Sequence, residues 1–313
     1  MELEVDLLIV GAGPTGLFAA YYAGFRDLSV ALVDALPEAG GQITAMYPEK
    51  MIFDVAGFPA VRGRELVTAL VQQADQWKPT YLLGRQARTL SDVDGRLEVG
   101  LADGGVVRAG AVLITAGIGE FKPRPLPAGD GWLDRGVVHF VPKLSAHTGQ
   151  DVVVVGGGDS AFDWALALHP IASSVTLVHR RATFRAHPPT VRQVRELGVE
   201  IITDAEVLEL RGEPDLAEVE LGLKGGDRKV LPAHAVVAAL GFTADLDHLA
   251  VLVDTTMRTA RERVYAAGDV AQYPGKVKLI ATGFGEAATA VNNIAVLLNP
   301  EAHLFPGHSS NAG

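Results

Sequence analysis

The hydrophobic pattern of the first hundred or so residues predicts an α/β unit that ends in antiparallel strands. The apolar run VDLLIV (5–10) predicts a buried strand, and Pro14 suits the first position of the helix that follows a glycine turn. SVALVD (29–34) predicts the next strand. Residues 89–117 then form short alternating segments separated by Asp-Gly pairs, which indicates a β-meander with hairpin turns.

The second half of the chain repeats this order. VVVV (152–155) predicts a buried strand before the turn GGGDSA (156–161), and SVTLVH (174–179) predicts the strand after the next helix. A second meander is expected across residues 207–241, again ending in an apolar strand and a glycine. The repetition favours an internal duplication into two Rossmann-like, three-layer α/β domains that each contain a β-meander.

The C-terminal part carries a strand and a helix but no second α/β unit of its own. VYAAGDVAQ (264–272) predicts the strand, and TGFGEAATAVNNIAVLL (282–298) predicts the helix. We therefore expect this part to return to the first domain and complete it. The expected domains are 1–118 with 244–313 and, inserted between them, 119–243, joined by two strands within KPRPLP (122–127) and GFTADLD (241–247).

The first glycine turn, GAGPTG (11–16), has the spacing and context of a dinucleotide-binding fingerprint. Its glycines permit a tight turn and let a pyrophosphate approach the backbone, while the start of the helix offers free N–H groups. Asp34 ends the next strand, where a carboxylate can accept hydrogen bonds from both ribose hydroxyls. The predicted site comprises Gly11, Gly13, Pro14, Thr15, Gly16 and Asp34.

The second turn differs from the first at the end of its second strand. That position holds His179, Arg180 and Arg181, and Arg185 follows shortly afterwards. A carboxylate there would repel a ribose 2′-phosphate, whereas arginines bind it through bidentate, charge-assisted hydrogen bonds. The pocket is therefore expected to prefer NADP(H), and its predicted residues are Gly156, Gly158, Asp159, Ser160, His179, Arg180, Arg181 and Arg185.

One pocket that avoids a 2′-phosphate and one that selects it together indicate a flavoprotein, in which hydride passes between NADP(H) and FAD. The C-terminal part supports FAD in the first domain. Gly268 and Asp269 follow an apolar strand, and the Asp269 carboxylate can bond the ribityl and pyrophosphate region. Thr282 begins a helix whose N–H groups can face the pyrimidine edge of the flavin.

Composition excludes several other classes of protein. The 313 residues include no cysteine, so dithiol redox chemistry and thiolate-bound metal or iron–sulfur sites are excluded, and no metal site is expected. A net charge of −10 disfavours nonspecific nucleic-acid binding. No apolar run has the length of a membrane span, and MELEVDLLIV lacks the basic region of a signal peptide, so we expect a cytoplasmic protein.

Five motifs together resemble those of the low-molecular-weight thioredoxin reductases over nearly the whole chain. The dithiol of that family would lie shortly before the second glycine turn, where this chain reads VVHFVPKLSAHTGQD (137–151) without a cysteine. Thioredoxin reduction through an internal dithiol is therefore excluded. The five motifs are GAGPTG (11–16), GGQI (40–43), GGGDSA (156–161), HRRATFRA (179–186) and AAGDV (266–270).

The chain more closely resembles the type 2 ferredoxin/flavodoxin–NADP+ reductases, which are homodimeric flavoproteins with a thioredoxin reductase-like fold. The resemblance rests on AMYPEKMIFDVAGFP (45–59), KLIATGFGEAATAVNN (278–293) and FPGHSSNAG (305–313). It implies that Tyr47 stacks on one face of the isoalloxazine and that His308 covers the other, reaching toward the partner subunit. It also implies FAD contacts from Gly41, Gln42, Asp54, Ala87, Phe121 and Ser310.

The resemblance implies electron transfer between NADPH and ferredoxin or flavodoxin, by hydride transfer to FAD and then one-electron steps. Two alternatives stay open at this point: a cysteine-free NADPH diaphorase that reduces quinones, free flavin or another small acceptor, and a non-catalytic flavin or nucleotide sensor. Because ferredoxins are acidic, docking requires a local basic patch. The expected patch comprises Lys50, Arg62, Arg64, Lys276 and Lys278, and His139 is expected to be structural.

Overall fold

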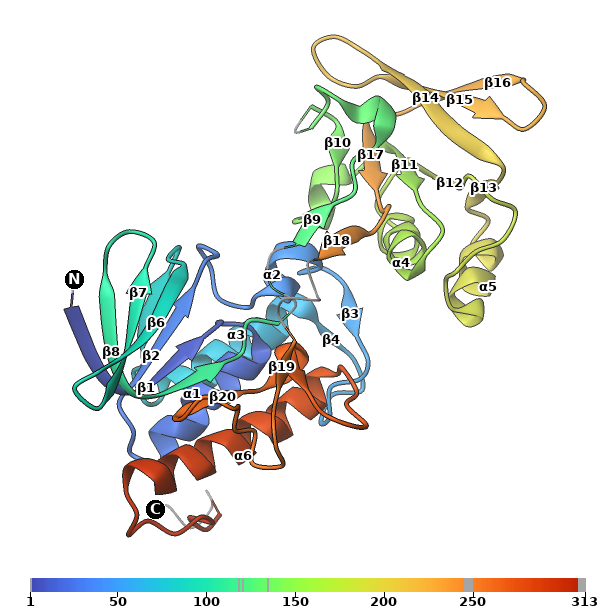
Figure 1. Cartoon of the computed structure of the whole chain (residues 1–313). Coiled ribbons are helices and arrows are strands. Elements are labelled where there is room, and N and C mark those ends of the chain that lie inside the picture. The colour runs from blue at the N-terminus through green and yellow to red at the C-terminus, as the bar shows by residue number, and fades with distance from the viewer. Residues whose placement is uncertain (1, 118, 120, 134, 245–249, 309–313) are drawn as a thin grey trace. The chain divides into compact units, whose positions relative to one another are not determined.

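The computed structural model describes residues 2–117, 119, 121–133, 135–244 and 250–308, and the chain divides into two compact units (Figure 1). Unit 1 comprises Met1–Ala45, Met51–Glu120 and Asp245–Gly313. Unit 2 comprises Met46–Lys50 and Phe121–Ala244. By these bounds the chain passes from one unit to the other four times, and the short excursion Met46–Lys50 has no signal in the sequence pattern.

A seven-stranded sheet forms the centre of unit 1, in the order β5-β2-β1-β8-β7-β6, with β20 also paired to β8. β1, β2, β5, β8 and β20 run parallel, whereas β6, β7 and the first half of β8 form an antiparallel meander. The bounds are β1 (Glu2–Val10), β2 (Val30–Asp34), β5 (Thr80–Leu83), β6 (Ala87–Val93), β7 (Arg96–Leu101), β8 (Val106–Ile114) and β20 (Val264–Ala266).

Strand β8 connects the meander to the parallel sheet because its two halves pair with different strands. Val106–Ala109 pair with β7, and Val112–Ile114 pair with β20, while β1 pairs along the whole of β8. At the hairpin between β6 and β7, Asp94 and Gly95 have φ values of 49° and 77°, as an Asp-Gly hairpin turn requires. The predicted meander and the predicted return of the 264–272 strand are therefore both present.

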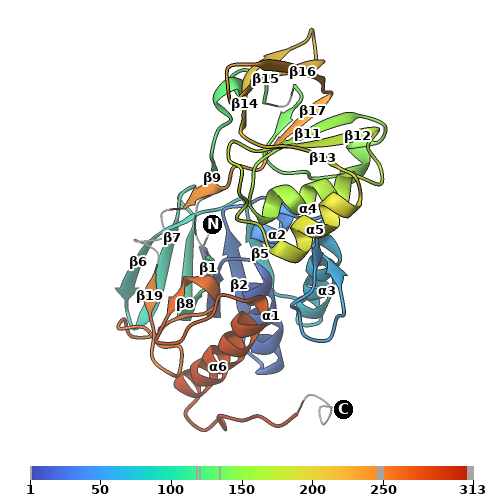
Figure 2. The same cartoon turned by 90° about the vertical axis from the view of Figure 1, so that its right-hand side faces the viewer.

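Three helices lie beside this sheet: α1 (Pro14–Phe25), α3 (Gly63–Asp75) and α6 (Ile280–Leu298). Helix α1 packs against both α3 and α6 (Figures 1 and 2). Its sequence PTGLFAAYYAGF is apolar on nearly all sides, as expected for a helix that packs against the sheet and two helices. The shorter elements are α2 (Gln42–Met46), β3 (Met51–Ile52), β4 (Val61–Arg62), β19 (Val251–Leu252), η3 (Gly268–Val270) and β21 (Ala271–Gln272).

Unit 2 has a five-stranded parallel sheet in the order β10-β17-β11-β12-β13. Alternate residues of β11 face opposite layers: Val152 and Val154 pack with the helices, and Val153 and Val155 pack with the meander. The bounds are β10 (Val137–Val138), β11 (Asp151–Val155), β12 (Ser174–Val178), β13 (Glu200–Ile202), β17 (Ala235–Ala238), α4 (Asp159–Leu168) and α5 (Pro188–Glu196). The remaining elements are β9 (Phe121–Pro123), β18 (Phe242–Ala244), η1 (Pro127–Gly129) and η2 (Leu144–His147).

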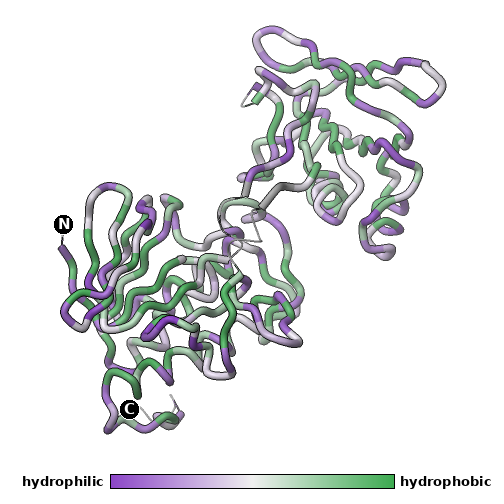
Figure 3. The backbone as a smooth tube through the Cα atoms, in the orientation of Figure 1, coloured by the Kyte–Doolittle hydropathy of each residue, from purple (hydrophilic) through white to green (hydrophobic). Residues whose placement is uncertain are grey.

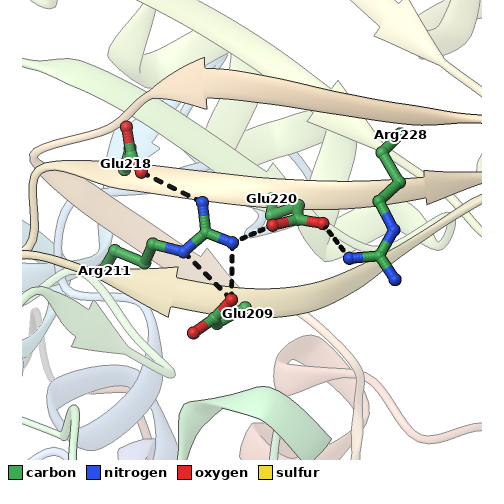
Figure 4. Close-up of polar contacts among 5 residues, drawn as sticks. All are labelled: Glu209, Arg211, Glu218, Glu220 and Arg228. Atoms are coloured by element: carbon green, nitrogen blue, oxygen red, sulfur yellow. Dashed lines mark hydrogen bonds and ion pairs between the residues drawn. The ribbon is translucent and has the colours of Figure 1, made fainter.

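The meander of unit 2 is a separate three-stranded sheet, β14 (Ala205–Arg211), β15 (Glu218–Leu223) and β16 (Arg228–Pro232). Val219 and Leu221 on one face of β15 belong to the core. The other face carries a network of ion pairs, in which Arg211 bonds three glutamates and Arg228 bonds one of them (Figure 4). The network consists of Glu209, Arg211, Glu218, Glu220 and Arg228.

The structure confirms the predicted fold class of two Rossmann-like α/β units with a meander each. Each core can be followed as hydrophobic stretches of the backbone in Figure 3. In the part of the chain that the structure describes, no helix combines the length and the apolar character that a membrane span requires. The two predicted connecting strands are β9 and β18, which pair antiparallel.

Candidate functional site

The glycine turn of unit 1 lies between the end of β1 and the start of α1. Gly11 has a φ of 116°, and a Cβ there would lie 2.5 Å from the Thr115 carbonyl oxygen. A Cβ on Gly16 would lie 1.9 Å from the Gly11 carbonyl oxygen. At Gly13 a Cβ would meet only the Cα of Gly41, at 3.9 Å, so the backbone at this residue is open to a ligand. The first and third glycines therefore close the turn, and the second exposes it.

Asp34 closes the same turn from the neighbouring strand. Its Oδ2 accepts a hydrogen bond from the Ala12 N–H at 2.7 Å, and its Oδ1 accepts one from the Leu36 N–H at 2.8 Å. Each carboxylate oxygen keeps a further lone pair, so the group can still accept ribose hydroxyls. The side chain therefore fixes the loop after β2 against the glycine turn in addition to its predicted ribose contact.

A second glycine pair brings the GGQI motif to the turn. The Gly40 N–H donates to the Ala12 carbonyl at 2.8 Å, and Gly41 has a φ of 57°. A Cβ at Gly41 would lie 3.0 Å from the Cα of Gly13. The side-chain amide of Gln42 lies beside Gly117, at 3.1 Å from where a Cβ would be. Gly13 and Gly41 thus form a backbone surface without side chains, which is the shape that a pyrophosphate needs.

Thr15 joins this turn to the C-terminal part of unit 1. A Cβ at Gly268 would lie 2.9 Å from Thr15 Oγ1, and a Cβ at Gly283 would lie 2.3 Å from it. Asp269 follows Gly268 in η3, and its half-buried carboxylate has no hydrogen-bond partner among the described residues. Thr282 lies in the first turn of α6, beside Gly283. The structure therefore gathers the predicted Thr15, Gly268, Asp269 and Thr282 at one place.

Other predicted FAD contacts lie further along the chain. Asp54 is exposed after β3, and Ala87 is half-buried at the start of β6. His308 is exposed and makes an edge contact with Phe305, with ring centroids 5.2 Å apart. Phe121 belongs to β9 in unit 2, and Ser310 lies outside the described residues.

The glycine turn of unit 2 lies between β11 and α4. Gly158 is the N-cap of α4 and has open space where a Cβ would be. The ring of His179 covers Gly157, at 2.3–2.5 Å from where a Cβ would be. Asp159 Oδ1 accepts a hydrogen bond from the His187 N–H at 2.7 Å, so this carboxylate fixes the loop after β12. Ser160 is exposed in the first turn of α4.

The loop after β12 folds back over the glycine turn and presents three arginines. The Arg185 N–H donates to the Gly157 carbonyl at 2.8 Å. The side chains of Arg180, Arg181 and Arg185 are exposed, and in the described part of the chain none forms an ion pair. The pKa of His179 is lowered by burial and further by the charges of these arginines, although its bond to the Thr183 carbonyl opposes this. The arginines therefore form a cationic site beside a histidine that tends to stay neutral.

The segment Met46–Lys50 belongs to unit 2. Its residues Tyr47 and Lys50 line a cavity of about 40 Å³ together with His139, Ser160 and Trp164. Lys50 Nζ lies 3.2 Å from Asp163 Oδ2 and 4.9 Å from the Trp164 ring centroid. Burial lowers the pKa of Lys50, and the charge of Asp163 opposes the shift. Tyr47, predicted to stack on flavin, is thus placed among residues of unit 2.

The expected basic patch is wrong for two of its residues. The Lys276 side chain is 3% exposed and pairs with Glu286, and the Lys50 side chain is 14% exposed and pairs with Asp163. The charge of each lysine is balanced by its carboxylate partner and is shielded from solvent, so it is not available to an acidic protein. Arg62 is half-buried, whereas Arg64 and Lys278 are exposed.

Three features of these sites were not predicted from sequence. Thr115 donates to the Gly11 carbonyl at 2.8 Å and fixes the turn from β8. Glu286 accepts a hydrogen bond from the Gly268 N–H at 2.7 Å. His139, expected to be structural, lines the unit 2 cavity with a buried Nδ1 that has no partner among the described residues. The one available signal was that Glu286 is the only charged residue of the 19-residue helix α6.

The fold and the two glycine turns define a class of α/β proteins with two Rossmann-like units, each with a dinucleotide-binding type of turn. The model of the family described as pyridine nucleotide-disulphide oxidoreductase matches residues 5–293, and the chain belongs to this family. The name records a disulphide chemistry that this chain, with no cysteine, does not perform within itself.

Relatives match the chain over its length. "Ferredoxin--NADP reductase" of Saccharopolyspora erythraea is 74% identical and covers 99% of this chain and 98% of its own length. The protein of the same name from Frankia casuarinae is 62% identical, with coverage of 98% and 99%. The crystal structure of T. acidophilum thioredoxin reductase has a TM-score of 0.76 at 24% identity and covers 93% of this chain and 98% of its own, which confirms the predicted fold.

Proposed function

We propose that this protein is an FAD-dependent ferredoxin–NADP+ reductase, which transfers electrons between NADPH and ferredoxin or flavodoxin. Full-length relatives at 62–74% identity that carry this name support the activity. The observation that carries the proposal is the contrast between equivalent strand ends. β2 ends at Asp34, whereas β12 leads into Arg180, Arg181 and Arg185. Bound FAD supplies the conversion between hydride chemistry and one-electron chemistry.

The residues of unit 1 fit FAD. Gly13 and Gly41 form the side-chain-free surface at the start of α1 on which a pyrophosphate can lie. Asp34 has lone pairs for the ribose, and Asp269 has a carboxylate without a protein partner in the described structure. In this proposal the remaining FAD contacts are Gly11, Pro14, Thr15, Gly16, Gln42, Asp54, Ala87, Phe121, Gly268, Thr282 and Ser310.

The residues of unit 2 fit NADP(H). Gly158 opens the N terminus of α4 to the pyrophosphate, and Asp159 and the Gly157 carbonyl hold the arginine loop beside it. The arginines bind the 2′-phosphate and fix the adenosine end of the nucleotide. Binding of the phosphate then helps to orient the nicotinamide, and in this proposal the hydride transfer needs no acid or base from the protein.

Three further parts of the proposal rest on the resemblance. Tyr47 stacks on the flavin and His308 covers its other face. The enzyme is a homodimer, to which the exposed Leu304 and Phe305 beside His308 contribute apolar surface. It works in the cytoplasm, where NADPH and ferredoxin are found. Light scattering on the purified protein tests the dimer, since a monomer at working concentration contradicts it.

The decisive experiment mixes the purified protein with NADPH and cytochrome c, with and without ferredoxin from the same organism. Strong stimulation by ferredoxin, and a much weaker reaction with NADH, is the expected result, because the arginines recognise the 2′-phosphate. The control repeats the assay with boiled enzyme, since NADPH reduces some acceptors slowly without it.

Two other outcomes identify the alternatives. If neither ferredoxin nor any other small carrier protein increases the turnover, the protein is a diaphorase that acts on quinones or free flavin. Bound flavin that keeps its yellow colour under NADPH without oxygen indicates a non-catalytic sensor. In either case the ferredoxin reductase assignment fails.

A further inference from the structure

A buried ion pair lies beneath the turn that carries Asp269. Lys276 Nζ pairs with Glu286 Oε1, and the side chains are 3% and 5% exposed. The same oxygen accepts a hydrogen bond from the Tyr273 hydroxyl at 2.6 Å, and the Lys276 ammonium lies 5.5 Å from the Tyr273 ring centroid. The other oxygen, Oε2, accepts from the Gly268 N–H at 2.7 Å. Both oxygens of Glu286 are therefore used, and the pair carries no net charge.

Stability alone does not explain this pair. Removing two charges from water costs several kcal/mol per ion, and apolar residues of similar volume often do as well or better. Glu286 is the one charged residue of α6, and the other buried residues of this helix are glycine, alanine, valine and isoleucine. The hydrogen bond to Gly268 connects the pair to one backbone amide of the turn at which Thr15, Asp269 and Thr282 gather. The position of the Lys276–Glu286 pair, at the turn that we assign to FAD, therefore suggests a role in binding this ligand.

We propose that Glu286 is a positioning residue of the unit 1 dinucleotide site, and that its balance with Lys276 sets the reduction potential of the flavin bound there. Glu286 fixes the Gly268 amide, and with it the direction of Asp269. Lys276 neutralises the carboxylate, so the ligand meets a buried region of zero net charge. The inference rests on the proposed FAD site and adds two residues to which no contact with FAD was assigned.

The sign of the effect follows from charge. Reduced flavin carries more negative charge than oxidised flavin, so an unbalanced positive charge nearby favours reduction and an unbalanced negative charge opposes it. Charges in a low-dielectric interior act over longer distances than charges in water. Glu286→Gln leaves Lys276 unbalanced, and Lys276→Met leaves Glu286 unbalanced. The two substitutions must therefore move the potential in opposite directions.

The test measures the midpoint potential of the protein-bound flavin by equilibration with a reference dye. Relative to wild type, Glu286→Gln is expected to raise the potential by about 30 mV and Lys276→Met to lower it by a similar amount, each a tenfold change in the two-electron equilibrium. The double variant, which carries neither charge, is expected near wild type. Glu262→Gln, an exposed residue of unit 1, is the matched control and should leave the potential unchanged.

A purely structural role gives a different pattern. It predicts that all three variants lose thermal stability and FAD affinity while the potential moves in one direction or not at all, and that pattern overturns the inference. If Glu286→Gln does not fold, Lys276→Met and the double variant still separate the two cases, because only charge balance restores the potential in the double variant. A wild-type protein that binds no flavin overturns the proposed function, and this inference with it.

A second readout does not depend on flavin. The hydrogen bond to Glu286, followed by burial, raises the pKa of Tyr273 to about 12. In the protein without flavin, Glu286→Gln is expected to lower this pKa, as seen in phenolate absorbance against pH. A Tyr273 titration that is the same in wild type and Glu286→Gln contradicts the network itself. Tyr273→Phe serves to identify the Tyr273 signal among the tyrosines.

Discussion

The two units contain the same parallel sheet, but the strand that completes it comes from opposite directions along the chain. The order β5-β2-β1-β8-β20 in unit 1 corresponds to β13-β12-β11-β17-β10 in unit 2. β20 follows its meander by more than a hundred residues, whereas β10 precedes its glycine turn. The two units therefore share the strands that carry the nucleotide turn, while the strand at the edge comes from a different part of the chain in each unit.

The meanders differ in the same way. In unit 1 a single strand, β8, belongs to both the meander and the parallel sheet. In unit 2 the corresponding strand is interrupted after Pro232, so that β16 and β17 belong to different sheets. Proline has no N–H to donate, and it ends the pairing there. The two units share the glycine turn at the end of β1 and β11. They differ in the meander and in the edge strand that complete each sheet.

The largest effect is expected at the last residue of each glycine turn, which is Gly16 in unit 1 and Ala161 in unit 2. Gly16→Ala places a Cβ 1.9 Å from the Gly11 carbonyl oxygen, and overpacking of this kind costs about 1–3 kcal/mol or more. We expect loss of bound flavin and a lower unfolding temperature. Ala161→Gly should cost only about 1 kcal/mol. Absorbance at 450 nm per protein and thermal unfolding measure both.

Equal flavin content in the two variants would show that the close approach at Gly16 is not what selects glycine there. The comparison is matched because each residue lies inside the first turn of its helix, α1 or α4, and is buried. In that event the difference between the two fingerprints carries no information about the ligand.

The second prediction concerns the strand ends. Replacing Arg180, Arg181 and Arg185 by alanine is expected to raise the KM for NADPH by about 100-fold. This is about 2.8 kcal/mol, the contribution of one to two charge-assisted hydrogen bonds of about 1.5–3 kcal/mol each. The KM for NADH should stay within about twofold, since it has no 2′-phosphate. Steady-state kinetics with both nucleotides measure the change, and Arg192→Ala, an exposed residue of α5, is the control. An equal rise for both nucleotides would contradict the assignment.

The third prediction follows from His179. Its pKa in the folded protein is below the usual 6.5, so between these two values the unfolded chain binds more protons. Folding stability is therefore expected to fall as the pH drops through that window, and His179→Gln should remove this component. Denaturation at several pH values between about 5 and 8 measures it. If the two proteins lose stability in parallel, His179 does not titrate as described.

Nucleotide binding sharpens this result. A bound 2′-phosphate offsets the arginine charges that lower the pKa of His179, so NADP+ should raise that pKa and its affinity should increase as the pH falls toward 6. NAD+ should show a smaller dependence. Proton uptake on binding, measured by calorimetry in two buffers, gives the sign directly.

The smallest expected effect is in the ion-pair network of the unit 2 meander, which has no counterpart of the same size among the described pairs of unit 1. Hydrogen bonding from Arg228 is the main cause of the lowered pKa of Glu220. Arg228→Met should lower the unfolding temperature slightly at low salt and less at high salt, since the Arg228 side chain is 69% exposed and salt screens its charge. An effect that persists at 1 M salt would mean that the Arg228 side chain contributes through packing.

Much of this architecture could be predicted from local sequence patterns. The rest could not, because it depends on contacts between segments that are distant in the sequence or too short to show a pattern. The glycine turns and Asp34 follow from spacing, and the meander of unit 1 from alternation around Asp-Gly pairs. β10 is two residues long, too short for any periodicity to register. Its role in the sheet is visible only once β17 lies beside it.

The charged residues of the sites were harder to place, because lysines and glutamates are expected at the surface. Lys50 pairs with Asp163, which is 113 residues away, and no local pattern encodes such a pairing. Lys276 and Glu286 are only ten residues apart, yet their burial depends on the turn at Gly268 and on Tyr273. The glycine turns could therefore be predicted from the sequence, but the buried charged residues that stabilise them could not.

The route of the chain has a consequence for synthesis on the ribosome. The parallel sheet of unit 2 is built from residues 137–238, which emerge together, whereas β1 in unit 1 must wait for β20 near residue 264 before its sheet has all of its strands. Domains fold as units during synthesis, and closing a long loop adds an entropic cost. Synthesis of the unit 2 sheet therefore starts second but can be completed first, while the sheet of unit 1 still lacks a strand.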